Sequence, residues 1–350
     1  MRFWNIIFLL SIQCFAENGS FSTPRAESAA VIIRTPTGGG SGFLVKMDGE
    51  TYIVTNQHVV YDSPASSIKM HLIDGTQLIP KSAEISDVDL IRFPISTTHQ
   101  SLTLAESMPS VNSPIATIGN SLDANVITAN VGTLKGVGPE EIEIDCDMVS
   151  GNSGGPVVDE NQNVIGVSTY VRFGNPDIST EGTRYRDVRR FALRLNGSLK
   201  WSPVAEQWRR YSETGQQIAK AESLLDELHY VGSRVFRNDS LEGFQPAFSK
   251  VAEAITGYDR LEKRKDKMLG QRATTQELER NNKILASTYR NIFQKLRDGC
   301  RSEAESLSRV TLPPEWKWME SRRREVLGKL SEMEVVFDEQ FNSKPKFLTF

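Results

Sequence analysis

The stretch Gly151-Asn152-Ser153-Gly154-Gly155-Pro156 places a serine in a turn that is rich in glycine. Such a turn exposes the hydroxyl and lets a substrate carbonyl approach the main chain. A serine hydroxyl becomes an effective nucleophile when an imidazole removes its proton and a carboxylate orients that imidazole. The chain carries candidates for both partners upstream of Ser153, so it has the parts of an acyl-transfer enzyme.

The histidine candidate is His58, in the stretch Thr55-Asn56-Gln57-His58-Val59-Val60. It follows the apolar run 52–54, which predicts a strand, so the imidazole is expected at a junction between strand and turn that faces a cleft. The other three histidines, His71, His99 and His229, lack such a setting. We therefore predict that His58 is the base.

Two carboxylates compete for the third position, Asp87 and Asp89 in the stretch Asp87-Val88-Asp89-Leu90-Ile91. In an extended segment these side chains point to opposite faces, so only one can face His58. Asp87 precedes the apolar stretch and stands at the entrance of a strand. This position favours Asp87 as the acid, and we expect Asp89 to be exposed or in a salt bridge.

The composition indicates two folded parts that meet near residue 200. The first 200 residues hold 18 of the 25 glycines, and from 29 to 171 short apolar or alternating runs are separated by turn residues. Asp48-Gly49 and Asp74-Gly75 are typical hairpin turns. This pattern predicts antiparallel sheets folded as barrels or a sandwich, with a last strand near 191–195.

The remaining residues predict helices. Four stretches have helical patterning, namely 203–231, 241–268, 274–309 and 314–341, with Ser202-Pro203 as the expected cap and breaks at Gly232, Gly270 and Pro313-Pro314. The third contains a seam of four apolar residues at spacings of four, three and four, namely Leu285, Tyr289, Ile292 and Leu296. A small antiparallel bundle or a long helical hairpin is expected.

The first residues predict export. Met1-Arg2, the apolar run 3–15 and Ala16 match a signal peptide cleaved after Ala16, which implies no stable membrane insertion of the mature chain.

The net charge of −3 gives no indication of nucleic-acid binding. Cys146 and Cys300 are expected to be free thiols, and with no metal-ligand cluster or phosphate loop in the sequence we expect no metal and no cofactor.

Five motifs together resemble the chymotrypsin-like serine proteases, most of all the HtrA/Deg branch. They are Gly40-Ser41-Gly42-Phe43-Leu44-Val45, the stretch around His58, Asp87-Val88-Asp89-Leu90, Ile118-Gly119-Asn120 and the turn around Ser153. They occur in the family's order over about 130 residues. The PDZ domain that follows the protease in that branch is not recognisable, and a helical region of unknown role, 202–342, takes its place.

The resemblance implies a fold and a set of roles. The fold would be a double β-barrel over 25–198 with the site between the barrels, followed by the helical region. His58 would be general base and acid, Asp87 its orienting partner and Ser153 the nucleophile, while the main-chain N–H groups of Gly151 and Ser153 would form the oxyanion hole. Four consecutive residues would line the specificity pocket and pair with substrate, namely Gly166, Val167, Ser168 and Thr169.

Substrate preference stays open at this point. Asp147 lies six positions before Ser153, where trypsin-like enzymes place the residue that selects Lys or Arg. The segment 144–150 resembles the HtrA pattern more, and that branch prefers small aliphatic side chains.

The sequence thus predicts an exported serine endopeptidase that acts on polypeptide. The alternative is a catalytically silent protease-fold scaffold whose helices bind partners. The helical region could also regulate the protease, as an arm for homo-oligomer formation or as a lid over the cleft.

Overall fold

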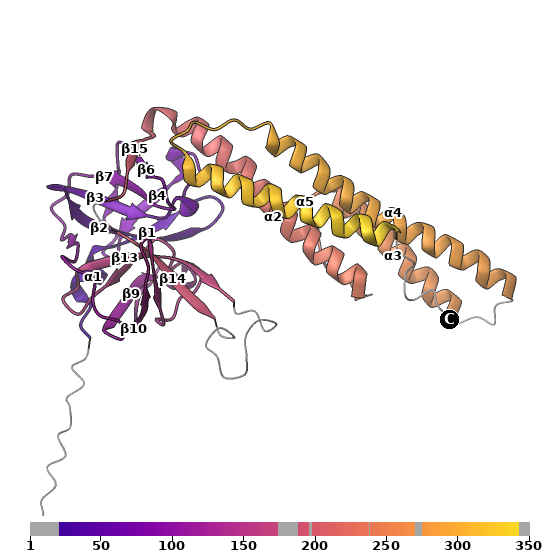
Figure 1. The fold of residues 1–350 in the computed structure, drawn as a ribbon, viewed down its shortest axis with the longest axis horizontal. Coiled ribbons are helices and arrows are strands. Elements are labelled where there is room, and N and C mark those ends of the chain that lie inside the picture. The colour runs from indigo at the N-terminus through magenta and orange to yellow at the C-terminus, as the bar shows by residue number, and fades with distance from the viewer. Residues whose placement is uncertain (1–20, 174–187, 196–197, 238, 270–274, 343–350) are drawn as a thin grey trace, which may run out of the picture.

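The computed structural model describes residues 21–173, 188–195, 198–237, 239–269 and 275–342. A β part comes first in the chain, and long helices extend from one side of it (Figure 1). The predicted fold class, a chymotrypsin-like double β-barrel followed by a helical region, is confirmed, with the first β unit as a nine-stranded sheet and the second as a closed barrel. The predicted signal segment, 1–16, lies outside the described residues.

The first half of the β part is a nine-stranded sheet. Its strand order is β15-β6-β7-β3-β2-β1-β4-β5, and β8 pairs in parallel with β2. The strands are β1 (Ala30–Arg34), β2 (Gly39–Met47), β3 (Glu50–Thr55), β4 (Lys69–Leu72), β5 (Gln77–Leu78), β6 (Glu84–Ser86), β7 (Ile91–Pro94), β8 (Leu102–Thr103) and β15 (Trp201–Pro203). A short helix, α1 (Pro24–Ala29), precedes β1.

The second half is a closed barrel with the order β10-β11-β14-β13-β12-β9. Its strands are β9 (Pro114–Asn120), β10 (Ile127–Val137), β11 (Glu141–Ile144), β12 (Pro156–Val158), β13 (Val164–Arg172) and β14 (Arg189–Arg194). The expected last strand is β14, which lies between β11 and β13.

Both predicted hairpin turns are present. Gly49, between β2 and β3, has φ +86°, and Gly75, between β4 and β5, has φ +87°. An L side chain rarely adopts this left-handed conformation, which explains the glycine at each position.

Among the described residues, the helical part contains four long helices: α2 (Trp208–Arg237), α3 (Ser249–Leu269), α4 (Thr275–Ser308) and α5 (Lys317–Asn342). α4 packs against both α3 and α5, and α2 packs against α5. The four seam residues of α4 predicted from the sequence are all buried. The amphipathic pattern therefore identified the face that packs.

Two details of the helical prediction are wrong. Ser202-Pro203 does not cap a helix, because Trp201–Pro203 pairs with β6 as strand β15 and the long helix begins at Trp208. Gly232 is no break either, since it lies inside α2, where a Cβ would come within 2.6 Å of the Phe337 ring on α5. The glycine is needed for close helix packing and not for a turn.

The helical part shares its hydrophobic core with the first sheet. One continuous cluster joins Ile32 and Phe43 of that sheet to Tyr211, Leu228 and Phe293 of the helices. The second barrel has a core cluster of its own, centred on Ile115, Leu134, Ile142, Val157 and Ile165. The helices are therefore packed onto the sheet that carries His58.

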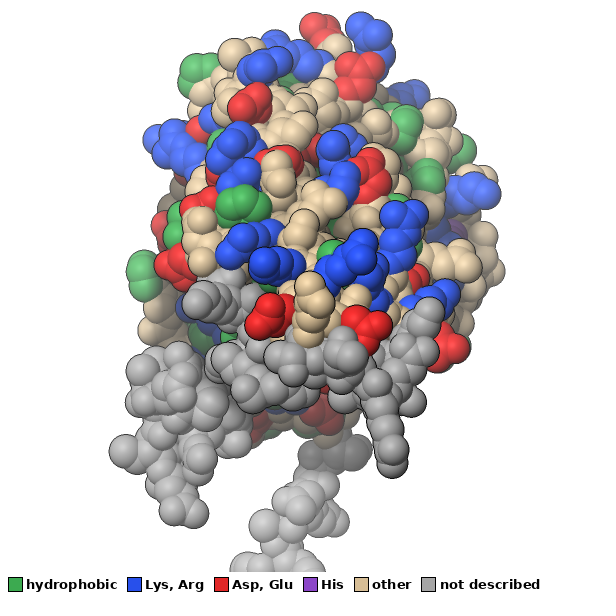
Figure 2. All heavy atoms as spheres, turned by 90° about the vertical axis from the view of Figure 1, so that its right-hand side faces the viewer, with side chains coloured by type: hydrophobic (Ala, Val, Ile, Leu, Met, Phe, Trp, Pro, Cys, Tyr) green, Lys and Arg blue, Asp and Glu red, His purple; other side chains and the backbone are tan. Residues whose placement is uncertain are grey.

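The surface of the helical end carries both signs of charge, with Lys, Arg, Asp and Glu interspersed (Figure 2). The basic run Arg322-Arg323-Arg324 is neutralised by ion pairs with Glu222, Glu320 and Glu325. Arg324 is exposed and Arg322 and Arg323 are half-buried, and all three charges are paired.

Cys146 and Cys300 are both free and buried, as expected. Among the described residues, no helix has the length and hydropathy needed to cross a membrane.

Candidate active site

His58 lies in a short 3₁₀ turn, η1 (Gln57–Val59), directly after β3. Its Nδ1 is 2.6 Å from Asp89 Oδ2, and its main-chain N–H donates to Asp89 Oδ1 at 3.0 Å. The imidazole is 35% exposed and the carboxylate 14%. Asp89 thus holds both the ring and the backbone of His58, which fixes the ring orientation and the tautomer with hydrogen on Nδ1.

The carboxylate beside His58 is therefore Asp89, and the prediction of Asp87 is wrong. The connection from β6 to β7 is not extended, because the N–H of Ser86 donates to the carbonyl of Leu90 at 2.9 Å and the N–H of Leu90 to that of Val88 at 2.7 Å. In this tight turn the alternation of a strand does not apply.

The Asp87 carboxylate instead lies 3.9 Å from Lys317 Nζ, a residue of α5. It also accepts a hydrogen bond from the Ser86 hydroxyl at 3.3 Å. Asp87 is therefore engaged at the junction between the sheet and the helices.

Asn56 and Gln57 anchor the aspartate turn, a role that the sequence analysis missed. Asn56 Nδ2 donates to the Asp89 carbonyl at 2.7 Å. Gln57 Nε2 donates to the carbonyls of Ser86 at 3.0 Å and Val88 at 2.5 Å. Both side chains are buried. The three residues 56–58 thus bind the whole turn that carries Asp89.

Two opposing effects set the protonation of His58. Burial of the imidazole lowers the pKa of His58, while the charge of Asp89 and the hydrogen bond to it raise the pKa, and the net result is a pKa above the ordinary value. The other charges that act on the ring are Arg322, which lowers its pKa, and Glu222, which raises it. The imidazolium that forms when His58 accepts a proton is therefore stabilised.

Ser153 lies in the loop between β11 and β12, in a turn that only glycine permits. Gly151 has φ +91° and Gly154 φ +87°. A Cβ on Gly154 would lie 2.1 Å from the Ser41 carbonyl oxygen and from Thr55 Oγ1. The Ser153 carbonyl accepts the N–H of Ser41 at 2.8 Å. The turn is thus locked against strand β2 of the first sheet.

Thr169 links the serine turn to the histidine turn. Its carbonyl accepts the Ser153 hydroxyl at 3.3 Å, and its Oγ1 accepts Asn56 Nδ2 at 3.2 Å. Within the described residues the Ser153 hydroxyl bonds to this carbonyl and not to His58. Catalytic hydrogen bonds are often long or misaligned until substrate binds.

The main chain around Ser153 leaves two N–H groups available. The Ser150 carbonyl accepts the N–H of Leu122 at 2.6 Å, and the Gly151 carbonyl accepts the Ser41 hydroxyl at 2.6 Å. In the described part of the chain, the N–H groups of Gly151 and Ser153 have no protein acceptor. The arrangement can therefore accommodate an anionic oxygen.

The predicted pocket residues lie on β13, but they do not contribute equally. Gly166 and Val167 are buried and paired with strands on both sides, β12 and β14, so they cannot pair with a substrate. Ser168 is also buried and exchanges main-chain hydrogen bonds with Gly154 and Gly155. Of these four residues, Thr169 is the one that contacts Ser153.

Asp147 is not a free charge on a pocket floor. Its carboxylate is 84% exposed and lies 3.2 Å from Arg190 Nη2 on β14. The ion pair with Arg190 offsets the negative charge of Asp147, which would otherwise attract the Lys or Arg side chain of a substrate.

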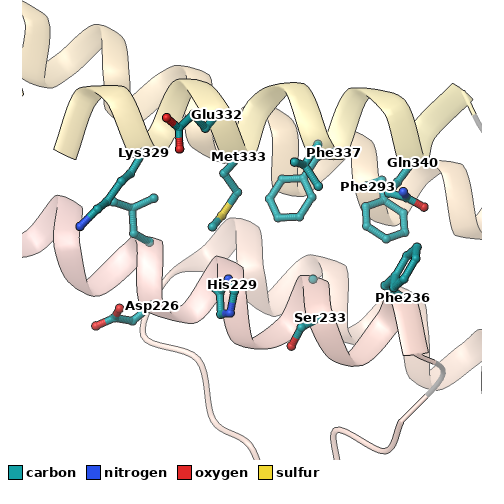
Figure 3. A pocket seen from close by; sticks show the side chains of 13 residues that line it. Asp226, His229, Ser233, Phe236, Phe293, Lys329, Glu332, Met333, Phe337 and Gln340 are labelled. Carbon is teal, nitrogen blue, oxygen red and sulfur yellow. The ribbon is translucent and has the colours of Figure 1, made fainter. Parts of the chain in front are cut away.

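A separate pocket of 570 Å³ lies between α2 and α5, lined by thirteen residues of the helical part. Asp226 and Lys329 lie at one end, His229 and Met333 in the middle, and Phe236, Phe293 and Phe337 at the other end (Figure 3). No residue of the sheets lines it. It is therefore distinct from the site around Ser153. Among the described residues, no group of three or more His, Cys, Asp or Glu could hold a metal ion.

Comparison with known proteins agrees with this geometry. Residues 40–167 match the model of a family described as a trypsin-like peptidase domain. Over 150 residues the chain is 32% identical to a protein of Bartonella henselae named probable periplasmic serine endoprotease DegP-like. The matched segment covers 39% of this chain and 28% of that protein. Over 223 residues it is 27% identical to the serine protease Do-like HtrA of Bacillus subtilis, covering 58% of this chain and 45% of that protein.

A solved structure, the serine endoprotease from Yersinia pestis, is similar with a TM-score of 0.38 and 22% identity, covering 50% of this chain and 61% of that one. The chain thus spans less than half the length of the two curated relatives described above. The two β units, with their paired histidine and aspartate and their glycine-flanked serine, have the arrangement of a chymotrypsin-like serine protease domain, and residues 40–167 match that domain. The two curated relatives are serine proteases of the DegP and HtrA type, and over the matched residues the chain is similar to them.

Proposed function

We propose that this chain is a serine endopeptidase that hydrolyses polypeptide through an acyl-enzyme on Ser153. His58 removes the proton of the Ser153 hydroxyl and later gives it to the leaving amine, and Asp89 holds the imidazole in the required tautomer. The observation that carries the proposal is the 2.6 Å contact between His58 Nδ1 and Asp89 Oδ2, in a turn that Asn56 and Thr169 connect to Ser153.

The oxyanion hole in this proposal consists of the N–H groups of Gly151 and Ser153. It is supported by the bonds that hold the two peptide groups concerned: the Ser150 carbonyl accepts the N–H of Leu122, and the Asn152 carbonyl accepts the N–H of Gly155. Removing one such donor costs on the order of 10²–10³ in turnover.

The substrate chain in this proposal extends along β13 from Thr169 onward, beyond the residues that pair with β12. Because Arg190 neutralises Asp147, we favour small aliphatic side chains over Lys or Arg at the position before the cleaved bond. A peptide library that reports cleavage sites tests this preference directly. Predominant cleavage after Lys or Arg would contradict it.

We also propose that the protein acts after export, in the periplasm or outside the cell. The support is the apolar start of the chain together with relatives that are named periplasmic. In this proposal the chain consists of a signal peptide (1–16), a protease domain (25–198) and a helical region (202–342).

The test of the reaction is Ser153→Ala beside the wild type. The wild type is expected to cleave casein and to be labelled by a fluorophosphonate probe, and the variant to do neither. Ser66→Ala is the matched control, because Ser66 is exposed and, in the described part of the chain, forms no hydrogen bond with His58, Asp89 or Ser153, and it should behave as the wild type. Equal labelling of the wild type and Ser153→Ala would refute the proposal.

One observation favours the alternative, a silent scaffold: the Ser153 hydroxyl bonds to the Thr169 carbonyl. A structure with a bound peptide-like inhibitor separates the two. An active protease should bring Ser153 Oγ within hydrogen-bond reach of His58 Nε2, whereas a scaffold should keep them apart.

A further inference from the structure

Helix α2 reaches the triad through one buried tyrosine. Tyr211 is fully buried, and its hydroxyl is 2.7 Å from Oε1 of Gln57, the residue that precedes His58. These two residues are 154 positions apart in the chain. The bond joins the helical part to the turn that carries the base.

The Gln57 amide also bonds to the turn that carries Asp89. Its nitrogen donates to the carbonyls of Ser86 and Val88, and its oxygen accepts from Tyr211. Both amide hydrogens are used, and Val88 is the neighbour of Asp89. One side chain thus connects the base turn, the acid turn and α2.

The protonation state of the Tyr211 hydroxyl decides which group donates in the hydrogen bond between Tyr211 and Gln57. Burial, with smaller effects of Asp89 and Tyr61, raises the pKa of Tyr211 well above its ordinary value, so the hydroxyl keeps its proton. It donates to the amide oxygen and thereby points the NH₂ group toward the two carbonyls. The reverse orientation would set the amide oxygen against both carbonyl oxygens, which is unfavourable.

Aromatic side chains hold the phenol in place. Trp316, at the start of the segment that leads into α5, meets the Tyr211 ring edge-on at 5.2 Å between centroids. Trp208 of α2 lies at 5.4 Å and donates from Nε1 to the Ser63 carbonyl at 3.1 Å. The position of the hydroxyl is therefore determined by packing between two helices and the first sheet.

We propose that Tyr211 is a positioning residue of the serine site, which orients the Gln57 amide and so holds the Asp89 turn in register with His58. The inference rests on the proposed function, since it assigns the helical part a role in that same site. Tyr211 touches no reacting atom, and in the described part of the chain its hydroxyl bonds to Gln57.

The test is Tyr211→Phe in the full chain, which removes the hydroxyl and keeps the ring. It leaves the Gln57 amide oxygen buried without a donor, a change that corresponds to roughly a 5- to 100-fold effect. We expect the rate of fluorophosphonate labelling to fall by that factor. Tyr230→Phe is the matched control, because Tyr230 lies on the same helix, is 38% exposed, and its hydroxyl forms no hydrogen bond within the described part of the chain.

A second readout separates positioning from loss of stability. The pKa of His58, followed by proton NMR of its imidazole and assigned with a His58→Ala variant, should fall toward the ordinary value in Tyr211→Phe, because the raised pKa depends on Asp89. The other charges that act on the ring, Glu222 of α2 and Arg322 of α5, are unchanged in this variant. This measurement requires no catalytic activity.

The outcomes are distinct. A wild-type labelling rate and an unchanged His58 pKa in Tyr211→Phe would overturn the inference while leaving the proposed function intact. A lower melting temperature with an unshifted His58 pKa would overturn it as well, since Tyr211 would then be merely structural. A wild type that the probe does not label would refute the proposed function, and the His58 pKa would still decide whether Tyr211 positions the pair.

Discussion

Replacing Asp89 with Asn should almost abolish activity, whereas the same change at Asp87 should not. Asp89 accepts two hydrogen bonds from His58, one from the ring at 2.6 Å and one from the main chain at 3.0 Å. An asparagine at this position has one oxygen and one NH₂ group. It retains one of these two bonds at most.

The size of the effect follows from the tautomer. If the amide oxygen keeps the main-chain bond, its NH₂ group faces Nδ1, and the imidazole must carry its hydrogen on Nε2. A ring in that state cannot accept the Ser153 proton, and a reversed tautomer costs about 10⁴ in turnover in Ser-His-Asp enzymes. The pKa of His58 should also fall, because Asp89 is the group that raises it.

Asp87→Asn is the matched control. The Asp87 carboxylate is 35% exposed and its ion pair with Lys317 spans 3.9 Å, a contact worth about 1 kcal/mol or less. Initial rates of casein cleavage and of fluorophosphonate labelling are measured for both variants, with circular dichroism to establish folding. Full activity in Asp89→Asn combined with loss in Asp87→Asn would refute the assignment of the acid.

Three further outcomes are expected. Gly151→Ala should lower turnover by a factor on the order of 10²–10³. Alanine rarely adopts a φ of +91°, and its Cβ would lie 2.0 Å from a backbone oxygen, so the main chain must shift and displace an oxyanion donor. The measure is kcat of the folded variant. Gly215→Ala should lower the free energy of unfolding by about 2 kcal/mol or more, since its Cβ would lie 2.1 Å from the Tyr61 carbonyl oxygen. Gly328 has open space around it, so Gly328→Ala should raise the free energy of unfolding by about 0.5–1 kcal/mol. Urea titration measures both. Because the pKa of His58 is raised and the base must be neutral, kcat/KM of the wild type should decline with falling pH at a midpoint above 6.5, and a midpoint below that value would contradict the effect of the carboxylate.

The sequence was sufficient for the residues whose chemistry shows in their immediate neighbours. Ser153 stands among glycines that its turn requires, and His58 follows a strand, so each was visible within six residues. The alternating strands and the amphipathic seam of α4 likewise identified the β part and the packed helix face. These features depend on local backbone conformation and periodicity.

The choice of acid could not be made in the same way. The rule that predicted Asp87 assumes an extended segment, whereas the main-chain bonds among Ser86, Val88 and Leu90 form a tight turn. That turn is stabilised by side chains of Asn56 and Gln57, some 30 residues earlier. Only the assembled sheet decides which carboxylate faces His58.

The helical part shows most clearly what lies beyond local patterns. Its amphipathic face predicted packing, but not that the partner of α2 would be the sheet that carries the base. Because the two share one hydrophobic core, Tyr211 and Trp208 are buried against that sheet and are not poised over an open cleft. A lid must break its contacts with the protein in order to open. The contacts of Tyr211 and Trp208 with the first sheet are buried, so opening would expose them to water. The structure therefore favours a helical region that supports the triad from the interior of the protein, and a chain cut after residue 200 should lose the packing around His58 together with its helices.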